Sequence, residues 1–236
     1  MAHKFNNISF KLIGINVVVF ILQTLLGTWF TETFKIVAGD IFSRPWIMFT
    51  AMFLHGSSTH LLFNMYALFL FGNLIERRIG SKRFLIVYLI SGVFASFAFS
   101  IFNLTITGMP QASAVGASGA IMAVLGLVIM LLPDLKVLFF FVIPMDMRTA
   151  GIIFALIDLF GLVTGGTGIA HIAHLAGLAC GVGYGYFLIK KRDSFKSNFS
   201  SKSKFSGTNR TSYSNKGRTI EMDEEDIEKY VKYGKL

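Results

Sequence analysis

Apolar residues along this chain gather in six long blocks, which are separated by connections of different lengths; the longest of these is residues 31–58. The blocks cover Leu12–Phe30, Thr59–Ile75, Phe84–Phe102, Ala114–Leu132, Thr149–Val163 and Ile169–Ile189. A helix needs about 20 mostly apolar residues to cross the hydrocarbon core of a bilayer. The pattern therefore predicts an all-α polytopic membrane protein, built as a bundle of six transmembrane helices. The first apolar run ends without a small-x-small cleavage site, so we expect a retained span rather than a signal peptide.

Two further apolar stretches fit a different role. Trp46–Leu54 repeats its aromatic residues at helical spacing, and Val137–Ile143 is too short to span and ends before Pro144. Short apolar segments with aromatic residues are typical of a membrane interface. We expect both stretches to be interfacial, and the glycine-rich segment 165–168 to form a tight turn.

Composition agrees with a membrane protein and divides the chain in two. Hydrophobic residues make up 53% of the chain and charged residues 15%, whereas soluble domains carry about 25% charged residues. From Lys190 onward the chain is rich in Ser, Lys and Asn, a composition typical of disorder. We expect a membrane domain at residues 1–190 and a disordered cytoplasmic tail at residues 191–236. Within the tail, Asp226–Tyr233 can form a short helix on a partner.

The basic residues predict the orientation of the chain. The net charge is +9, and the clear basic clusters are Arg77–Arg83 and Lys190–Arg192. Such clusters are typical of cytoplasmic segments beside anionic lipid. With six spans, both termini are then cytoplasmic, and we expect a multi-pass protein of the cell membrane. No basic stretch is interleaved with exposed aromatic residues, so we expect no nucleic-acid partner. The lone Cys180 excludes a disulfide framework and a cysteine metal cluster.

Polar residues recur near the starts of spans two, four and six. These three spans run in the same direction, so their amino-terminal ends share the outer leaflet. Span two carries His60 and Asn64 on one helical face, span four carries Ser118, and span six carries His171 and His174. All lie within about two turns of their helix starts and hence at similar depth. Polar side chains inside a bilayer are costly without partners, so the set indicates a functional site.

This set of residues can perform acyl transfer. A serine hydroxyl becomes a nucleophile when a positioned base takes its proton, and a neutral histidine can do so near pH 7. The tetrahedral oxyanion needs donors, which Asn64, His60 and the backbone N–H of Ser118 can supply. We expect no Asp or Glu partner in this layer, and so a Ser–His pair without an acid. Asp158 lies midway along span five, and we interpret it as a structural hydrogen-bonding residue, with a direct catalytic role as the alternative.

The choice of base between His171 and His174 depends on the glycines of span six. From His174, glycines follow at the spacings i+3, i+7 and i+11, namely Gly177, Gly181 and Gly185. A stripe without side chains lets two helices approach closely. We expect it to pack on the small residues of span four, which are Gly119, Ala123 and Gly126. His174, at the head of the stripe, is therefore the predicted base.

The ordered motifs resemble those of the rhomboid family of intramembrane serine proteases. They are His60-Leu61-Leu62-Phe63-Asn64, Gly72…Glu76…Gly80, Gly116-Ala117-Ser118-Gly119 and Ala173-His174-Leu175-Ala176-Gly177…Gly181. The resemblance covers residues 10–190 and implies a six-helix rhomboid-like bundle around a water-filled cavity open to the outer face. It also implies Ser118 as nucleophile and His174 as base, with His60 and Asn64 at the oxyanion. Two positions depart from the family pattern: Ile47 follows Trp46 where many members have Arg, and Met122 stands where some have Tyr.

We therefore expect an intramembrane serine endopeptidase that cuts transmembrane segments of single-span or other membrane proteins near the outer face. No metal or organic cofactor is expected. The resemblance implies substrates with small residues at the cut and a helix that unwinds easily. One alternative is a catalytically silent rhomboid-like protein that binds membrane clients. Another is a metal-dependent membrane protein that uses His60, His171, His174 and Asp158, although the chain has no His-Glu-x-x-His motif.

Overall fold

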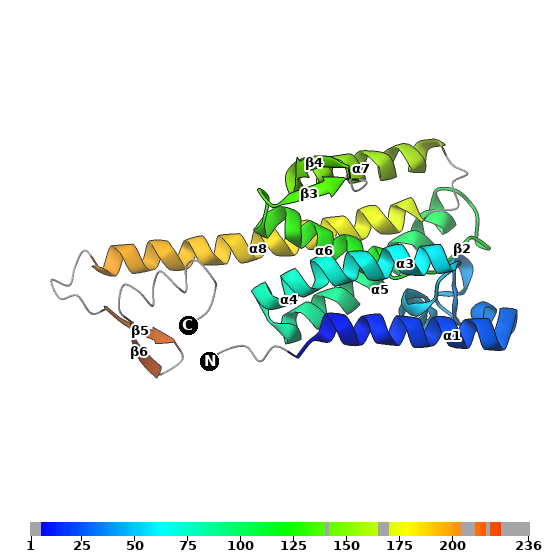
Figure 1. Ribbon diagram of the computed structural model, residues 1–236, viewed down its shortest axis with the longest axis horizontal. Helices are drawn as coiled ribbons and strands as arrows, with labels where there is room; N and C mark the ends of the chain where they lie inside the picture. The colour runs from blue at the N-terminus through cyan, green and yellow to red at the C-terminus, as the bar shows by residue number, and fades with distance from the viewer. Residues whose placement is uncertain (1–5, 140–141, 165–169, 204–210, 216–217, 223–236) are drawn as a thin grey trace.

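The computed structural model is a bundle of helices with three small two-stranded sheets (Figure 1). It describes residues 6–139, 142–164, 170–203, 211–215 and 218–222. The longer helices are α1 (Ile8–Phe34), α3 (Ser58–Ala67), α4 (Asn73–Ile79), α5 (Ser81–Thr105), α6 (Ser118–Leu131), α7 (Met147–Thr164) and α8 (His171–Ser203). The shorter helical elements are η1 (Ala38–Asp40), α2 (Ile47–Thr50), η2 (Ala51–Phe53) and the π-helical η3 (Leu68–Gly72). The strands are β1 (Ile36–Val37), β2 (Ser113–Ala114), β3 (Lys136–Phe139), β4 (Ile143–Asp146), β5 (Thr211–Asn215) and β6 (Arg218–Met222).

Within the described residues, five helical segments are long and apolar enough to cross a membrane. They are α1, the continuous segment Ser58–Ile79 made of α3, η3 and α4, then α5, α7 and the first part of α8. The fourth predicted span is present as α6, but with 14 residues it is shorter than predicted. The prediction of an all-α polytopic membrane protein is confirmed, and the large apolar side chains that α1 and α7 leave exposed suit contact with lipid.

Helix α6 is the central element of the bundle. It packs against α3, α5, α7 and α8, and every residue from Gly119 to Val128 is buried. Nearly all of its side chains are apolar, on every face of the helix, as expected of a helix that other helices enclose. Helix α7 lies at the edge of the bundle, on α6 and α8, whereas α1 lies toward the opposite edge (Figure 1).

A buried carboxylate joins the ends of three helical segments. Glu76 of α4 is fully buried and accepts hydrogen bonds from the backbone N–H groups of Ile8 and Ser9 at 2.8 and 2.9 Å. It also accepts from the hydroxyls of Ser9 at 2.8 Å and Ser81 at 2.5 Å. The carboxylate thus caps the start of α1, where helical N–H groups lack intrahelical partners. The glutamate of the predicted Gly72…Glu76…Gly80 motif therefore has a structural role.

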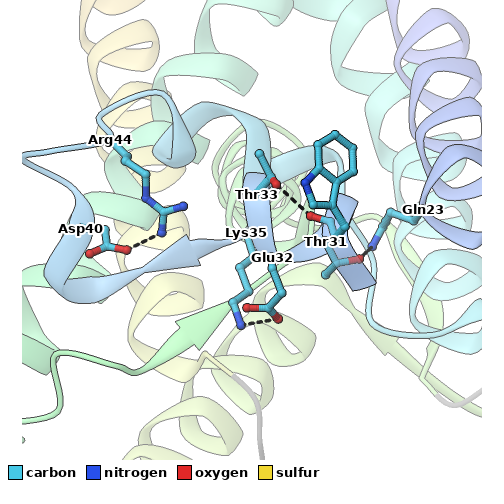
Figure 2. A network of polar contacts seen from close by, with 8 residues as sticks. Gln23, Thr31, Glu32, Thr33, Lys35, Asp40 and Arg44 are labelled. Atoms are coloured by element: carbon cyan, nitrogen blue, oxygen red, sulfur yellow. Dashed lines mark hydrogen bonds and ion pairs between the residues drawn. The ribbon is translucent and has the colours of Figure 1, made fainter. Parts of the chain in front are cut away.

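The connection after α1 is a packed, ordered unit. Helix α1 bends at Gly27, which has φ +69° and ψ −154°. Gln23 bridges the bend by donating to Thr31 at 3.1 Å, and its amide oxygen accepts from the backbone N–H of His55 at 2.8 Å. Further along the connection Lys35 pairs with Glu32 at 2.7 Å, and Arg44 pairs with Asp40 (Figure 2).

Apolar packing anchors the same connection where the family motif has an arginine. Ile47 is completely buried in a second small core. The other buried members of that core are Ile36, Ala38, Ile41, Ala51, Ala95, Phe99 and Ala173. Trp46 and Phe49 remain exposed beside it, which suits the predicted interfacial position. The departure at Ile47 therefore replaces a polar anchor with a buried side chain.

Two other segments have secondary structure that the prediction did not include. The described residues of Val137–Ile143 belong to the antiparallel pair of β3 and β4, in which Lys136 pairs with Asp146, and their interfacial position remains a prediction. Helix α8 continues to Ser203, so the predicted boundary at residue 190 falls inside it, and the hairpin of β5 and β6 follows. The division into two domains remains a prediction. The expected turn at 165–168 and the expected helix Asp226–Tyr233 lie outside the described residues.

Candidate active site

Ser118 is the first residue of α6, at the end of a short extended segment. The strand Ser113–Ala114 pairs with Ile36–Val37, and the N–H of Gly116 donates to the carbonyl of Ala51 at 2.9 Å. Gly116 has φ +134°, a conformation that ends any helical path through it. The predicted helix start at Ala114 is therefore wrong by four residues. As a result, the Ser118 N–H is one of the helix-start donors that have no partner within α6.

His174 of α8 lies within hydrogen-bond distance of Ser118. The distance between His174 Nε2 and Ser118 Oγ is 2.8 Å. The glycine stripe explains this close approach, because α6 and α8 run in parallel with their backbones in contact. A Cβ on Gly181 would stand 2.0 Å from the carbonyl oxygen of Ala123, and one on Gly126 would stand 2.7 Å from that of Leu178. The predicted packing of span six on span four is confirmed.

Asp158 of α7 joins this pair, contrary to the expectation that no acid lies at this depth. Its Oδ1 atom is 3.0 Å from His174 Nδ1 and 2.7 Å from His171 Nδ1. The interpretation of Asp158 as a hydrogen-bonding residue is correct, but the prediction that no acidic residue lies beside the Ser–His pair is wrong. Helix α7 ends at Thr164, and α8 then runs back in the opposite direction from His171. Residues one to two turns before the end of α7 therefore face the first turn of α8.

His60 of α3 lies near Ser118, next to Gly116. A Cβ on Gly116 would stand 3.0 Å from His60 Nε2 and 3.6 Å from Ser118 Oγ, so glycine is required there on steric grounds as well as for its positive φ. The N–H of Gly56 donates to His60 Nδ1 at 3.4 Å. A neutral imidazole that accepts at Nδ1 carries its proton on Nε2. His60 therefore offers an N–H donor beside the serine.

Asn64 lies one turn below His60 on the same helix. Its side chain is buried, and its amide Nδ2 donates to the carbonyl of His60 at 3.1 Å. This bond leaves the second amide hydrogen available to another acceptor. Of the four predicted site residues, Ser118, His174 and His60 lie close together. Asn64 is connected to them by its hydrogen bond to the carbonyl of His60.

His55 supports the ring of His60 from the side of the connection after α1. The two ring centroids are 5.1 Å apart with an edge-to-face angle of 68°. Burial, and secondarily the charge of His60, lower the pKa of His55 to about 4. His55 is therefore neutral near pH 7, and its role here is to pack against the ring of His60.

A small pocket adjoins Ser118. Its volume is about 30 Å³, and its lining is dominated by small residues, which include Ser118, Gly119, Ala95, Ala114, Ala170 and Ala173. A cavity of this size has room for about one water molecule or a methyl group. It therefore suits a small side chain at the reacting position.

Asp158, His171 and His174 also lie close enough together to bind one metal ion. One ligand atom from each of Asp158, His171 and His174 can be chosen so that all three lie within 4.8 Å of one another. Two imidazoles and a carboxylate suit several divalent transition metals. In the described part of the chain this group does not include His60, which the metal-dependent alternative required.

The signal that identifies Asp158 was present in the sequence. It is the one acidic residue within the apolar block Thr149–Val163, and an ionisable residue inside a span normally has a functional partner. The hydrophobic pattern does not show where α7 ends and α8 begins, and these two boundaries set Asp158 opposite the start of α8. The ring of His171, the alternative base, lies against Gly161 and Asp158.

Comparison with known proteins gives a single family. The model of the rhomboid domain matches residues 43–191. The chain is 39% identical over 153 residues to presenilin-associated rhomboid-like protein A, mitochondrial, of Danio rerio, which covers 62% of this chain and 39% of the relative. It is 30% identical over 190 residues to rhomboid protein 1, mitochondrial, of Saccharomyces cerevisiae, covering 78% and 54%. It is 35% identical over 192 residues to the human presenilin-associated rhomboid-like protein, mitochondrial, covering 76% and 48%.

These comparisons correct one prediction. The chain spans about half of the length of these relatives or less, and they are named as mitochondrial proteins. Their names contradict the prediction that this protein belongs to the cell membrane. The physical reason is that clusters of Lys and Arg report the orientation of a span and do not identify the membrane that holds it.

Proposed function

This chain belongs to the rhomboid family, and from that premise we propose that it is an intramembrane serine endopeptidase. Ser118 is the nucleophile and His174 the base. The observation that carries the proposal is the 2.8 Å distance between Ser118 Oγ and His174 Nε2. That distance lies within the range over which a base takes a proton from a nucleophile. Membrane-spanning segments of other proteins are the proposed substrates.

The proposed reaction follows serine acyl transfer. His174 takes the hydroxyl proton while Ser118 Oγ attacks the scissile carbonyl, and it then gives that proton to the leaving amine. Water hydrolyses the acyl-enzyme with the same histidine as base. The oxyanion receives hydrogen bonds from the Nε2–H of His60, from the free backbone N–H at the start of α6 and from the amide of Asn64. The dipole of α6 adds to this stabilisation, because the positive end of a helix is its amino terminus.

The pocket beside Ser118 supports a preference for small residues at the cut. Its lining, in which alanine, glycine and serine predominate, leaves about 30 Å³, so a large side chain would have to displace neighbouring residues. A substrate segment must also present an extended backbone to reach Ser118, because a peptide bond within a helix is shielded. Segments that contain small and helix-breaking residues meet both requirements.

The test is cleavage that depends on Ser118. The purified chain in detergent would be incubated with a panel of tagged single-span proteins, beside Ser118→Ala, which removes one oxygen from a helix that tolerates alanine. We expect cleavage and labelling by a fluorophosphonate probe in the original chain and neither in the variant. Thermal unfolding of both proteins controls for the fold. Absence of labelling in the folded original chain would favour the catalytically silent client-binding protein instead.

A metal-dependent activity is the second candidate, favoured by the proximity of Asp158, His171 and His174. It makes the opposite prediction for chelators. Under the serine mechanism, cleavage rates stay the same after exhaustive treatment with a chelator. A loss of cleavage that added zinc or manganese restores would support the metal-dependent candidate.

A further inference from the structure

We propose that Asp158 is a positioning residue that orients His174 for catalysis, so that Ser118, His174 and Asp158 act together as a triad. This inference rests on the proposed serine mechanism. It assigns a role to a carboxylate on α7, a helix that supplies neither the nucleophile nor the base. Three helices, α6, α8 and α7, then contribute one member each.

The geometry forms one continuous chain of contacts. Ser118 Oγ is 2.8 Å from Nε2 of His174, and the opposite ring nitrogen, Nδ1, is 3.0 Å from Asp158 Oδ1. Each ring nitrogen of His174 therefore has a partner, Ser118 at Nε2 and Asp158 at Nδ1. Asp158 is 6% exposed, so water competes little for the carboxylate, and the hydrogen bond is correspondingly stronger than one at the surface.

The carboxylate also selects the tautomer of the base. A carboxylate oxygen has no proton to donate, so a bond to His174 Nδ1 requires the proton to lie on Nδ1. The lone pair then lies on Nε2, which faces the hydroxyl of Ser118 and can accept its proton. When that proton transfers, His174 becomes a cation next to a buried anion, which stabilises the charge that develops during attack. Without the carboxylate, the ring has no fixed preference for the reactive tautomer.

His171 holds the carboxylate in place. Its Nδ1 is 2.7 Å from the same Oδ1 atom, and its side chain is 6% exposed. Its ring occupies the space left by the missing side chain of Gly161, since a Cβ there would stand 2.2 Å from His171 Nε2. The shared oxygen thus receives two N–H groups from one face of α8. The competing explanation is that Asp158 serves His171 alone and has no effect on His174.

The experiment compares Asp158→Asn with a matched carboxylate-to-amide control, Asp134→Asn, whose side chain is 90% exposed. Steady-state cleavage is measured in detergent together with the ¹⁵N spectrum of histidine-labelled protein, in which the signals of His174 are identified by their loss in His174→Gln. We expect Asp158→Asn to lower kcat by about 10² to 10⁴ with KM changed by less than about threefold. The His174 signals should change from the Nδ1–H tautomer to a mixture. Asp134→Asn should leave both readouts unchanged.

Two outcomes would overturn the proposal. The first is a folded Asp158→Asn variant whose kcat stays within about threefold of the original. The second is a spectrum of the original chain with the proton of His174 on Nε2, which is decisive even where Asp158→Asn does not fold. Absence of any Ser118-dependent cleavage would instead refute the proposed function, while the spectrum would still report whether Asp158 fixes the tautomer.

Discussion

Gly177 of α8 lies against Gly119 of α6 so closely that a methyl group on Gly177 would stand 2.0 Å from the carbonyl oxygen of Gly119. Gly119 directly follows Ser118 and Gly177 lies about one turn after His174, so this contact sets the separation of the two helices where the side chains of Ser118 and His174 meet. The contact is between backbones, which cannot move aside as the end of a flexible side chain can.

Gly177→Ala should therefore reduce both stability and activity. The added methyl must push α8 from α6, and overpacking of this kind costs about 1–3 kcal/mol. The same shift lengthens the distance from His174 to Ser118, so we expect a loss of cleavage of at least about tenfold. Thermal unfolding and cleavage assays in detergent measure the two effects. Gly183→Ala on the same helix is the control, because a Cβ there meets nothing within 4 Å, and a normal Gly177→Ala protein would show that the packing is not required.

His174→Ala and His171→Ala should differ in kind. The first removes the proposed base and should eliminate cleavage and fluorophosphonate labelling, because the hydroxyl of Ser118 then has no acceptor at 2.8 Å. The second leaves His174 in place and should retain a measurable fraction of both. Rates of labelling in folded protein distinguish them. The reverse pattern would assign the base to His171.

Asn64→Ala should slow turnover more than it weakens substrate binding. An oxyanion donor acts mainly in the transition state, and removal of one typically lowers kcat by about 10²–10³. Initial rates over a range of substrate concentrations separate kcat from KM. If only KM rises, Asn64 contributes to packing or substrate binding, as its bond to the carbonyl of His60 also allows.

Stability should fall in mild acid because of His55. Its pKa is lowered from 6.5 to about 4 in the folded protein, first by burial and then by the charge of His60. The unfolded chain therefore binds a proton that the folded protein does not, so stability is complete above about pH 6.5 and declines as pH falls toward 4. Replacing this ring by His55→Phe should remove about 1 to 2 kcal/mol of the loss between pH 7 and pH 5. Unfolding midpoints at both pH values test this, and equal losses in the two proteins would exclude His55 as the cause.

The sequence predicted those parts of the site that repeat along a single helix. His60 and Asn64 share a face by their spacing, and the glycines after His174 predict close packing with α6, which the structure confirms. Such patterns are local, because the 3.6-residue period of a helix relates residues without knowledge of the rest of the chain. The similar depth of Ser118 and His174 was predicted from the common direction of spans four and six.

The parts that the sequence did not predict depend on where elements end. Ser118 begins α6 because Gly116 and the strand Ser113–Ala114 prevent an earlier start, and the apolar residues before Ser118 conceal that boundary. Asp158 reaches His174 because α7 and α8 run in opposite directions across a short connection. Small shifts in helix boundaries change which side chains meet, and hydrophobicity alone does not determine them. The hairpin of β3 and β4 likewise depends on pairing between two segments that each look like interfacial residues.

Helix α6 measures about 21 Å from its 14 residues, roughly 9 Å less than the hydrocarbon thickness of a typical bilayer. If Ser118 is the nucleophile, as proposed, substrate chains must descend below the headgroups to reach the end of so short a helix. Under that proposal, depth limits access before any side chain is recognised, and the reaction rate depends on bilayer thickness. A thinner membrane brings the hydroxyl nearer to the aqueous boundary, and a thicker one withdraws it, without any change in the protein.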